Sequence, residues 1–310
     1  MNKAVFFAAA AATLVAGQAF AQSSVDIYGR LNLSVERQNA NGIKSTQLAN
    51  NSSRLGFRGT ETLGGGLKAG FVLEHGLDPS NGTAASAFWG RQSEVNLSGA
   101  FGTVRLGNFT SEAYFATADY ISMHNHDTGP SSDALYAYAG RNTNKIAYRT
   151  PELTKGLTLE GAYSLKETAA TKSYELAANY SMGKLALGAG YEKAGNANQY
   201  AVRAFYELGA FLLGGYVQRD ENVYASGDRT TYRLAGAYMM GKSEFHLNYG
   251  RAGDYSNVAN SSANQYTLAY NYNLSKRTKA YTYYTKVNAS AATGYAADFS
   301  SVALGLRHNF

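Results

Sequence analysis

The sequence predicts an all-β protein, a transmembrane antiparallel β-barrel of sixteen strands built as a single domain over residues 22–310. Features at both ends of the chain and a pattern that runs between them predict this fold. The last nine residues, Val302 to Phe310, alternate apolar with small or polar side chains and finish on an aromatic ring. Such alternation is typical of a strand with one apolar and one polar face. A terminal strand of this kind is typical of barrels in the bacterial outer membrane.

The N-terminal residues have the composition of a secretory signal peptide. Lys3 is followed by an apolar run over residues 4–16 and by small residues at positions 19 and 21, so we expect residues 1–21 to be removed. The apolar run is shorter than the roughly 20 residues that a membrane-spanning helix needs. No later stretch is longer, and a closed β-barrel is the other structure that satisfies every backbone hydrogen bond inside a bilayer.

The composition agrees with strands that cross a membrane. The chain has 25 tyrosines, 14 phenylalanines and 33 glycines, but only three prolines and no cysteine, which excludes disulfides and thiolate metal sites. A mean hydropathy of −0.31 does not oppose a membrane location, because alternating strands average a lipid face with a lumen face. Removing residues 1–21 takes Lys3 from the 28 bases and leaves 27, against 22 acids. These charges are dispersed, which argues against a nucleic-acid partner.

Apolar alternation recurs along the whole mature chain. In the first strand, Val25 to Leu33, we expect odd positions to face lipid and Asp26, Arg30 and Asn32 to face the lumen. The further strands are predicted near residues 51–61, 66–77, 89–99, 102–109, 142–150, 156–167, 172–182, 184–194, 198–208, 210–220, 229–240, 242–252, 263–274, 277–288 and 298–310. Tight turns at 63–66 and 182–183 alternate with polar loops at 38–50, 78–88, 110–140 and 253–262. Short turns on one rim and long loops on the other are typical of outer-membrane barrels.

Tyrosines on four of the predicted strands repeat at one spacing. Each pair is six residues apart and has the parity that faces lipid: Tyr174 and Tyr180, Tyr200 and Tyr206, Tyr232 and Tyr238, Tyr266 and Tyr272. Six residues span about 20 Å of strand, so each pair can bracket the apolar band of about 25 Å that such barrels present to lipid. We interpret the pairs as two aromatic girdles. Tyrosines scattered over a soluble β-sandwich would not share one spacing and one parity.

Several segments carry a family resemblance, most specifically Ser53 to Lys68, together with residues 24–29, 90–92, 97–99, 101–107, 274–278 and 305–310. Over essentially its whole length the sequence resembles the general porins of the β-proteobacterial outer membrane. The resemblance implies a homotrimer of sixteen-stranded barrels in the cell outer membrane, in contact with lipid and lipopolysaccharide, whose third long loop folds into the lumen. It also implies that Phe310 belongs to the signal read by the barrel-assembly machinery. The sequence departs from the family pattern at Thr62, often an acid, and at Asn108, often an arginine.

The third long loop, residues 110–140, is the predicted constriction of the pore. It has no lysine or arginine but carries four acids, Glu112, Asp119, Asp127 and Asp133. Opposite the loop we expect the bases of lumen parity, namely Arg30, Arg54, Arg58, Arg105, Lys145 and Arg149. Acid on one side and base on the other give a transverse field, which low-dielectric walls focus on the narrowest water. The predicted function is passive diffusion of small polar solutes and ions. Lys184, Arg203 and Arg233 are expected to lie far from the loop.

Two other functions stay open. A substrate-selective channel for anionic solutes or sugars could use the same barrel, and a sugar channel would line its lumen with aromatic rings, as Tyr281 and Tyr283 could in one register. An enzyme is disfavoured because no histidine has a nucleophile motif, so no catalytic residues are predicted. Residues 124–127, His-Asn-His-Asp, lack a third distant ligand, so no metal or other cofactor is predicted. Inward acids are expected to pair with inward bases in the wall, Glu160, Glu175, Glu207 and Glu244 with Lys166, Lys184, Arg203 and Arg233.

Overall fold

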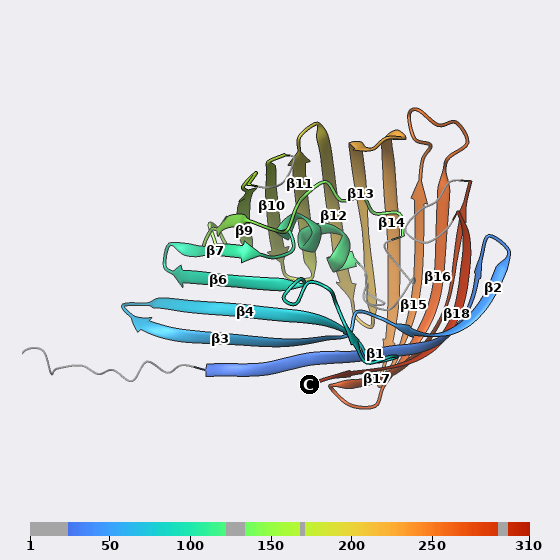
Figure 1. Cartoon of the computed structure of the whole chain (residues 1–310), viewed down its shortest axis with the longest axis horizontal. Helices are drawn as coiled ribbons and strands as arrows, with labels where there is room; N and C mark the ends of the chain where they lie inside the picture. Colours follow the sequence, from blue (N-terminus) through green and yellow to red (C-terminus); the bar gives the residue numbers. More distant parts are fainter. Residues whose placement is uncertain (1–23, 122–133, 168–170, 291–296) are drawn as a thin grey trace, which may run out of the picture.

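The computed structural model describes residues 24–121, 134–167, 171–290 and 297–310, which form a closed barrel of sixteen antiparallel strands (Figure 1). The predicted fold class is therefore confirmed. The predicted signal peptide lies outside the described residues. No helix within the described ranges is long and apolar enough to cross a membrane.

Within the described residues, the secondary structure consists of strands with two short helices between β7 and β8. The elements are β1 Ser24–Ala40, β2 Ile43–Asn50, β3 Arg54–Gly64, β4 Leu67–Asp78, β5 Thr83–Ala84, β6 Gln92–Gly99, β7 Gly102–Asn108, α2 Glu112–Tyr114, the π-helix η2 Phe115–Asp119, β8 Lys145–Arg149, β9 Leu157–Ser164, β10 Ser173–Met182, β11 Leu185–Ala194, β12 Ala197–Leu208, β13 Phe211–Tyr224, β14 Gly227–Met240, β15 Ser243–Ala252, β16 Ala263–Asn273, β17 Thr278–Ala289 and β18 Asp298–Asn309.

Two of these assignments are not separate strands of the barrel. β2 pairs with residues 33–40 of β1 and β3 with residues 24–30, so β2 and β3 are two parts of one barrel strand interrupted at residues 51–53. β5 forms only a short ladder with β4. β1 closes the ring by pairing with β18, from Arg30 opposite Asn309 onward.

Side chains alternate between an apolar outer face and a polar inner face. On the outer face, Leu176 and Leu234 are 59% and 61% exposed. On the inner face, Gln199, Gln218 and Arg233 are at most 1% exposed. This is the reverse of a soluble protein, and it is the arrangement that lipid outside and polar groups inside require.

The tyrosine pairs lie on the outer face, as predicted. Seven of the eight are at least 37% exposed. Near the start of β10, the rings of Tyr174 and Tyr163 lie 5.1 Å apart between centroids, and near the end of β14 those of Tyr238 and Phe211 lie 4.9 Å apart. Aromatic contacts therefore cross between strands toward both rims, and they bracket the apolar band.

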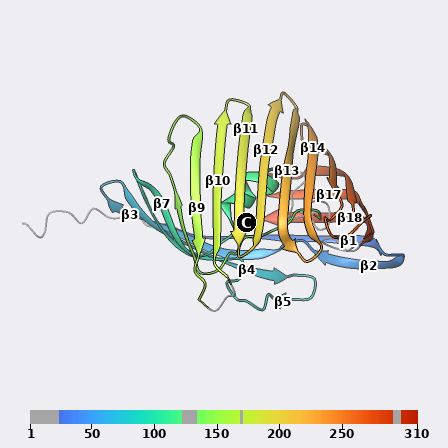
Figure 2. The same cartoon turned by 90° about the horizontal axis from the view of Figure 1, so that it is seen from above.

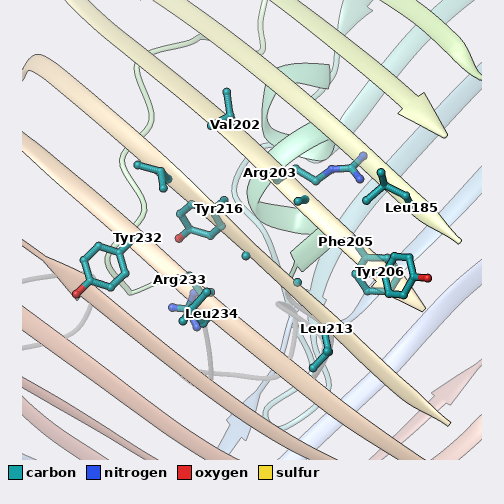
Figure 3. A pocket seen from close by; sticks show the side chains of 14 residues that line it. Leu185, Val202, Arg203, Phe205, Tyr206, Leu213, Tyr216, Tyr232, Arg233 and Leu234 are labelled. Carbon is teal, nitrogen blue, oxygen red and sulfur yellow. The ribbon is translucent and has the colours of Figure 1, made fainter. Parts of the chain in front are cut away.

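A shallow apolar groove of about 680 Å³ crosses the outer face of β11–β14 (Figure 3). It exists because Ala204 lies opposite Gly215 in the ladder, and neither side chain fills the space between larger neighbours such as Val202 and Leu213. The groove lies on the lipid-facing side of the wall, so it is separate from the lumen.

The prediction of a polar loop over residues 38–50 is wrong. β1 continues to Ala40, and the chain turns at Asn41 and Gly42, whose φ values are 52° and 88°. Both residues tolerate the left-handed conformation that a two-residue hairpin needs, and Asn-Gly is the strongest short-range hairpin signal in a sequence. The turn converts most of the predicted loop into β2, which lies beside β1 (Figure 2).

Candidate pore constriction

The third long loop connects β7 with β8, and its described parts are residues 109–121 and 134–144. The side chain of Ser111 caps α2 by accepting a hydrogen bond from Ala113 N at 3.0 Å. Both α2 and η2 contact β10 and β11, and η2 also contacts β12 (Figure 1).

An apolar cluster joins this loop to the wall. Ile121 and Tyr136 of the loop are buried in one cluster with Phe205 of β12 and Tyr216 of β13. The ring centroids of Tyr136 and Tyr216 lie 5.7 Å apart. Burial of apolar and aromatic surface of this kind stabilises the contact by roughly 1.5–3 kcal/mol for each large side chain.

Arg203 of β12 also binds the loop. Its Nε donates to the carbonyl oxygen of Ala116 at 2.6 Å, and its guanidinium lies 3.7 Å from the ring centroid of Tyr120. A Cβ added at Gly250 would lie 3.4 Å from Arg233 Nη2 and 3.4 Å from Leu135 Cδ1 of the loop, so Arg233 also lies beside the loop. The prediction that Arg203 and Arg233 lie far from the loop is therefore wrong, because the path of the loop along the wall decides the matter and strand parity does not.

The loop helices and the N-terminal strands lie on opposite sides of the ring. From β1 the ring passes through β3, β4, β6, β7, β8, β9 and β10 and reaches β11 at the eighth step, half of the sixteen. Arg30 stands on β1 and Arg54 on β3, as Cα partners in the ladder. These two bases are thus half a circumference from the strands that α2 and η2 contact.

Glu112 contacts the wall directly. It forms an ion pair with Arg149 of β8, and its Oε1 accepts a hydrogen bond from Asn179 of β10 at 3.0 Å. Burial raises the pKa of the Glu112 carboxyl above its ordinary value, while the Arg149 charge opposes that rise. Asp119 is half-buried at the end of η2. Asp127 and Asp133, together with the histidines of residues 124–127, lie outside the described residues.

Arg105 and Arg149 form an arginine–glutamate network with Glu94, Glu112 and Glu160. Arg105 Nη2 lies 2.7 Å from Glu94 Oε2, and its Nη1 lies 3.6 Å from Glu160 Oε1. Arg149 Nε lies 2.9 Å from Glu160 Oε2. Two of the predicted constriction bases are therefore matched by three carboxylates in this network.

Lys145 is the most deeply buried of the predicted bases. Its Nζ lies 2.7 Å from Glu175 Oε2, and the two side chains are 0% and 3% exposed. Lys145 and Glu175 therefore form an internal ion pair of the wall.

A second group of bases, which we call the basic patch, consists of Arg30, Arg54, Lys279 and Arg307. They face inward on β1, β3, β17 and β18, with Arg30 opposite Arg54 and Lys279 opposite Arg307. Within two residues of any of the four, their own strands carry no acid. Arg54 Nε reaches Glu74 of β4 at 3.7 Å and Lys279 Nζ reaches Glu244 of β15 at 2.8 Å. Sequence reasoning missed Lys279 and Arg307, although both have lumen parity.

Arg58 does not join the basic patch. Its Nε lies 3.4 Å from Asp26 Oδ2, and the two side chains are 59% and 60% exposed. The six predicted bases thus fall into separate groups: Arg30 and Arg54 in the basic patch, Arg105 and Arg149 in the network, Lys145 in a buried pair and Arg58 in an exposed one.

The predicted partners of Glu160, Glu175 and Glu244 are wrong. Glu160 pairs with the network arginines, Glu175 with Lys145, and Glu244 with Lys279. Which charges meet depends on how neighbouring strands are aligned, and strand parity alone does not give that alignment.

Tyr281 and Tyr283 face inward, but both are buried. Their rings are parallel at 6.4 Å, and their hydroxyls donate to Asn32 Oδ1 at 2.9 Å and to Glu36 Oε1 at 2.7 Å. These rings are part of the wall packing and offer no open stacking surface to a sugar.

A closed sixteen-stranded barrel with an apolar outer face, aromatic girdles and a charged inner face is the architecture of an outer-membrane channel. The sequence pattern that defines Gram-negative porins matches residues 8–292, and the chain belongs to that family. It is an outer-membrane porin, a channel for small solutes.

Individual relatives agree. Outer membrane porin protein 32 of Delftia acidovorans is 31% identical over 298 residues, which cover 84% of this chain and 83% of that protein. The solved structure of an anion-selective porin from Comamonas acidovorans superposes with a TM-score of 0.77 at 27% identity, covering 93% of this chain and all of that one. OmpT of Vibrio cholerae, solved in a trimer form, has the same fold with a TM-score of 0.73 at 18% identity, over 93% of this chain and 99% of that one.

Proposed function

We propose that this porin conducts small hydrophilic solutes and ions through a lumen narrowed by loop 110–140, and that it favours anions over cations. The observation that carries the proposal is the position of Arg30 and Arg54 of the basic patch, half a ring away from the strands that the loop helices contact. The loop helices are held on β10–β12, which leaves a water path between them and the wall where Arg30 and Arg54 stand.

The charge of the opposing wall supports the anion preference. Four bases are gathered on four adjacent strands of the ring, and the acids that they reach, Glu74 and Glu244, stand on other strands. Low-dielectric walls focus the field of such a patch on the adjacent water. The relative from Comamonas acidovorans, described as anion-selective, shares 27% of its residues with this chain.

A salt gradient across a planar bilayer tests the proposal. The reversal potential of the wild-type channel should have the sign of anion preference at low salt, and the preference should shrink in 1 M salt, where the screening length is about 3 Å. A reversal potential of the opposite sign at low salt would contradict it.

Nothing in this conduction needs a catalyst, and we infer that the protein is not an enzyme. The relatives that the chain matches are channels. We also propose a homotrimer embedded among outer-membrane lipid and lipopolysaccharide, as the trimer form of OmpT suggests. Gel migration before and after boiling tests the trimer.

Phe310 is proposed as part of the signal that the barrel-assembly machinery reads. Its ring covers Gly29 of β1, where a Cβ would lie only 2.4 Å from the ring, and the two residues exchange backbone hydrogen bonds of 3.0 and 3.1 Å. Phe310 therefore sits on the seam that closes the ring. Deleting it should reduce the amount of folded porin in the outer membrane by far more than replacing the outward-facing Leu304 with Ala, as immunoblots of membrane fractions would show. Equal levels of the two variants would contradict this role.

A further inference from the structure

The return segment of the loop, residues 134–141, is bound by one inward side chain from each of five consecutive strands. We propose that these side chains, here called the clamp, set the width of the pore by standing in for the strand partners that this segment lacks. The members of the clamp are Glu175 of β10, Glu192 of β11, Gln199 of β12, Gln218 of β13 and Arg229 of β14. The inference rests on the proposed function, because it assumes that the loop narrows the lumen.

Gln218 binds both backbone groups of one loop residue. Its Oε1 accepts from Ala137 N at 3.0 Å, and its Nε2 donates to the carbonyl oxygen of Ala137 at 2.7 Å. Gln218 is 0% exposed, as is Ala137. A neighbouring strand would offer the same pair of groups, so this amide acts as a one-residue ladder partner.

Glu192 binds the next stretch of the loop. Its Oε2 accepts hydrogen bonds from Ala139 N at 3.0 Å and from Gly140 N at 2.9 Å. Glu175 continues the series on β10, where its Oε1 accepts from Arg141 N at 3.3 Å. A buried carboxylate that accepts two backbone N–H groups forms charge-assisted hydrogen bonds, which are stronger than neutral ones.

The other two members bind the opposite end of the segment. Gln199 Nε2 donates to the hydroxyl of Tyr136 at 3.1 Å, and Arg229 Nη2 donates to the carbonyl oxygen of Leu135 at 3.3 Å. Leu135 itself packs with Ala252 and Ala263, on β15 and β16. The clamp thus follows the segment across about a third of the ring.

The clamp matters because residues 134–141 belong to no strand, yet several of them are buried. A buried backbone group without a partner costs about 1–3 kcal/mol. Removing one clamp side chain would therefore make the held position of the loop less favourable than a position in which its backbone meets lumen water. The loop would then no longer be fixed across the lumen, so that wider openings form, and the barrel strands would keep their own ladders.

Liposome swelling with neutral sugars of increasing size, together with single-channel recording, tests the clamp. We expect Gln218→Leu to let the largest sugars enter several-fold faster than in the wild type and to increase current fluctuations in the open channel. The matched control is Asn51→Leu. Asn51 is 3% exposed between β2 and β3, and its amide binds wall residues, donating to the hydroxyls of Ser34 at 2.7 Å and of Tyr281 at 3.0 Å. The control should keep the size limit of the wild type.

A second pair of variants covers the case in which Gln218→Leu does not assemble. Glu192→Leu removes both hydrogen bonds to the loop and should widen the pore, whereas Glu192→Gln keeps an acceptor oxygen and should restore most of the wild-type limit. If the clamp had a merely structural role, Gln218→Leu and Glu192→Leu would lower the heat resistance of the porin without changing which sugars pass. Wild-type swelling that depends on sugar size but stays the same in every clamp variant would overturn the inference. Wild-type swelling that does not depend on sugar size would instead overturn the proposed narrowing of the lumen.

Discussion

The arginine–glutamate network and the basic patch use the same kind of residue for different ends. In the network, Arg105 and Arg149 are matched by three carboxylates, one of which comes from the loop. In the basic patch, Arg30 stands directly opposite Arg54, with no acid within two residues on either strand. Both groups face the same lumen. Carboxylates outnumber the arginines in the network, whereas the patch gathers four bases, two of which reach Glu74 and Glu244. We therefore expect the patch to contribute more positive potential to the pore than the network does.

The largest expected effect follows from removing bases of the patch. Replacing Arg30, Arg54 and Arg307 with Ala should shift the reversal potential strongly toward cation preference. The variant removes three positive charges from this wall and removes no acid. At physiological salt only charges within about 8 Å of an ion act strongly on it, so the shift should fade in 1 M salt.

The matched control for the patch is the double replacement of Arg105 and Arg149 with Ala. It leaves Glu94, Glu112 and Glu160 close together without their cations, and crowded carboxylates take up protons. The net loss of positive charge is therefore smaller than the count of arginines suggests. A shift per arginine as large as in the patch variant would break the distinction between the two regions.

For stability we expect the buried Lys145–Glu175 pair, which belongs to neither region, to matter more than the basic patch. Lys145→Met leaves Glu175 buried without its cation and should cost about 3–5 kcal/mol of unfolding free energy, as broken internal ion pairs do. Adding Glu175→Gln should recover most of that loss, since the charge disappears while an acceptor remains for Arg141 N. Thermal unfolding in detergent measures both. Arg30→Ala in the patch should change the unfolding temperature much less, and a loss as large as that of Lys145→Met would contradict the comparison.

The smallest effect concerns pH. Burial raises the pKa of Glu112, so acidification neutralises this loop carboxyl before an ordinary glutamate. The loop then loses a negative charge, and anion preference should rise as the pH falls through that pKa. For stability the sign is the same, because a raised pKa in the folded state favours folding at low pH and the advantage is lost as the pH rises. Glu112→Gln should show the higher anion preference already at neutral pH. A pH titration of the reversal potential in which this variant follows the wild-type curve would exclude Glu112 as the group responsible.

The barrel could be predicted from the sequence because its signals are local. Alternation with period two sets which face each residue takes, and the tyrosine spacing follows from the width of the apolar band, so both survive errors of a few residues in strand bounds. The hairpin at Asn41 and Gly42 has a local signal too, because Asn-Gly is a typical two-residue hairpin turn. Each of these features needs only one strand or one turn to be read correctly.

The partners of the lumen charges could not be predicted because they depend on contacts between distant parts of the chain. Glu160 meets Arg149 through the alignment of β8 with β9, and a shift of two residues would give it another neighbour. Arg203 meets the carbonyl oxygen of Ala116 through the path of a loop that carries no periodic signal. Asp127 and Asp133 remain predicted members of the constriction.

The break between β2 and β3 has a consequence for how this protein can change over generations. The alignment of β3 with β1 is fixed below the break, from Ser24 opposite Thr60 to Arg30 opposite Arg54. Residues added or lost at the tip of the β1–β2 hairpin change its length without sliding β3 past β1. The length of that hairpin can therefore vary while the alignment that positions Arg30 and Arg54 stays the same.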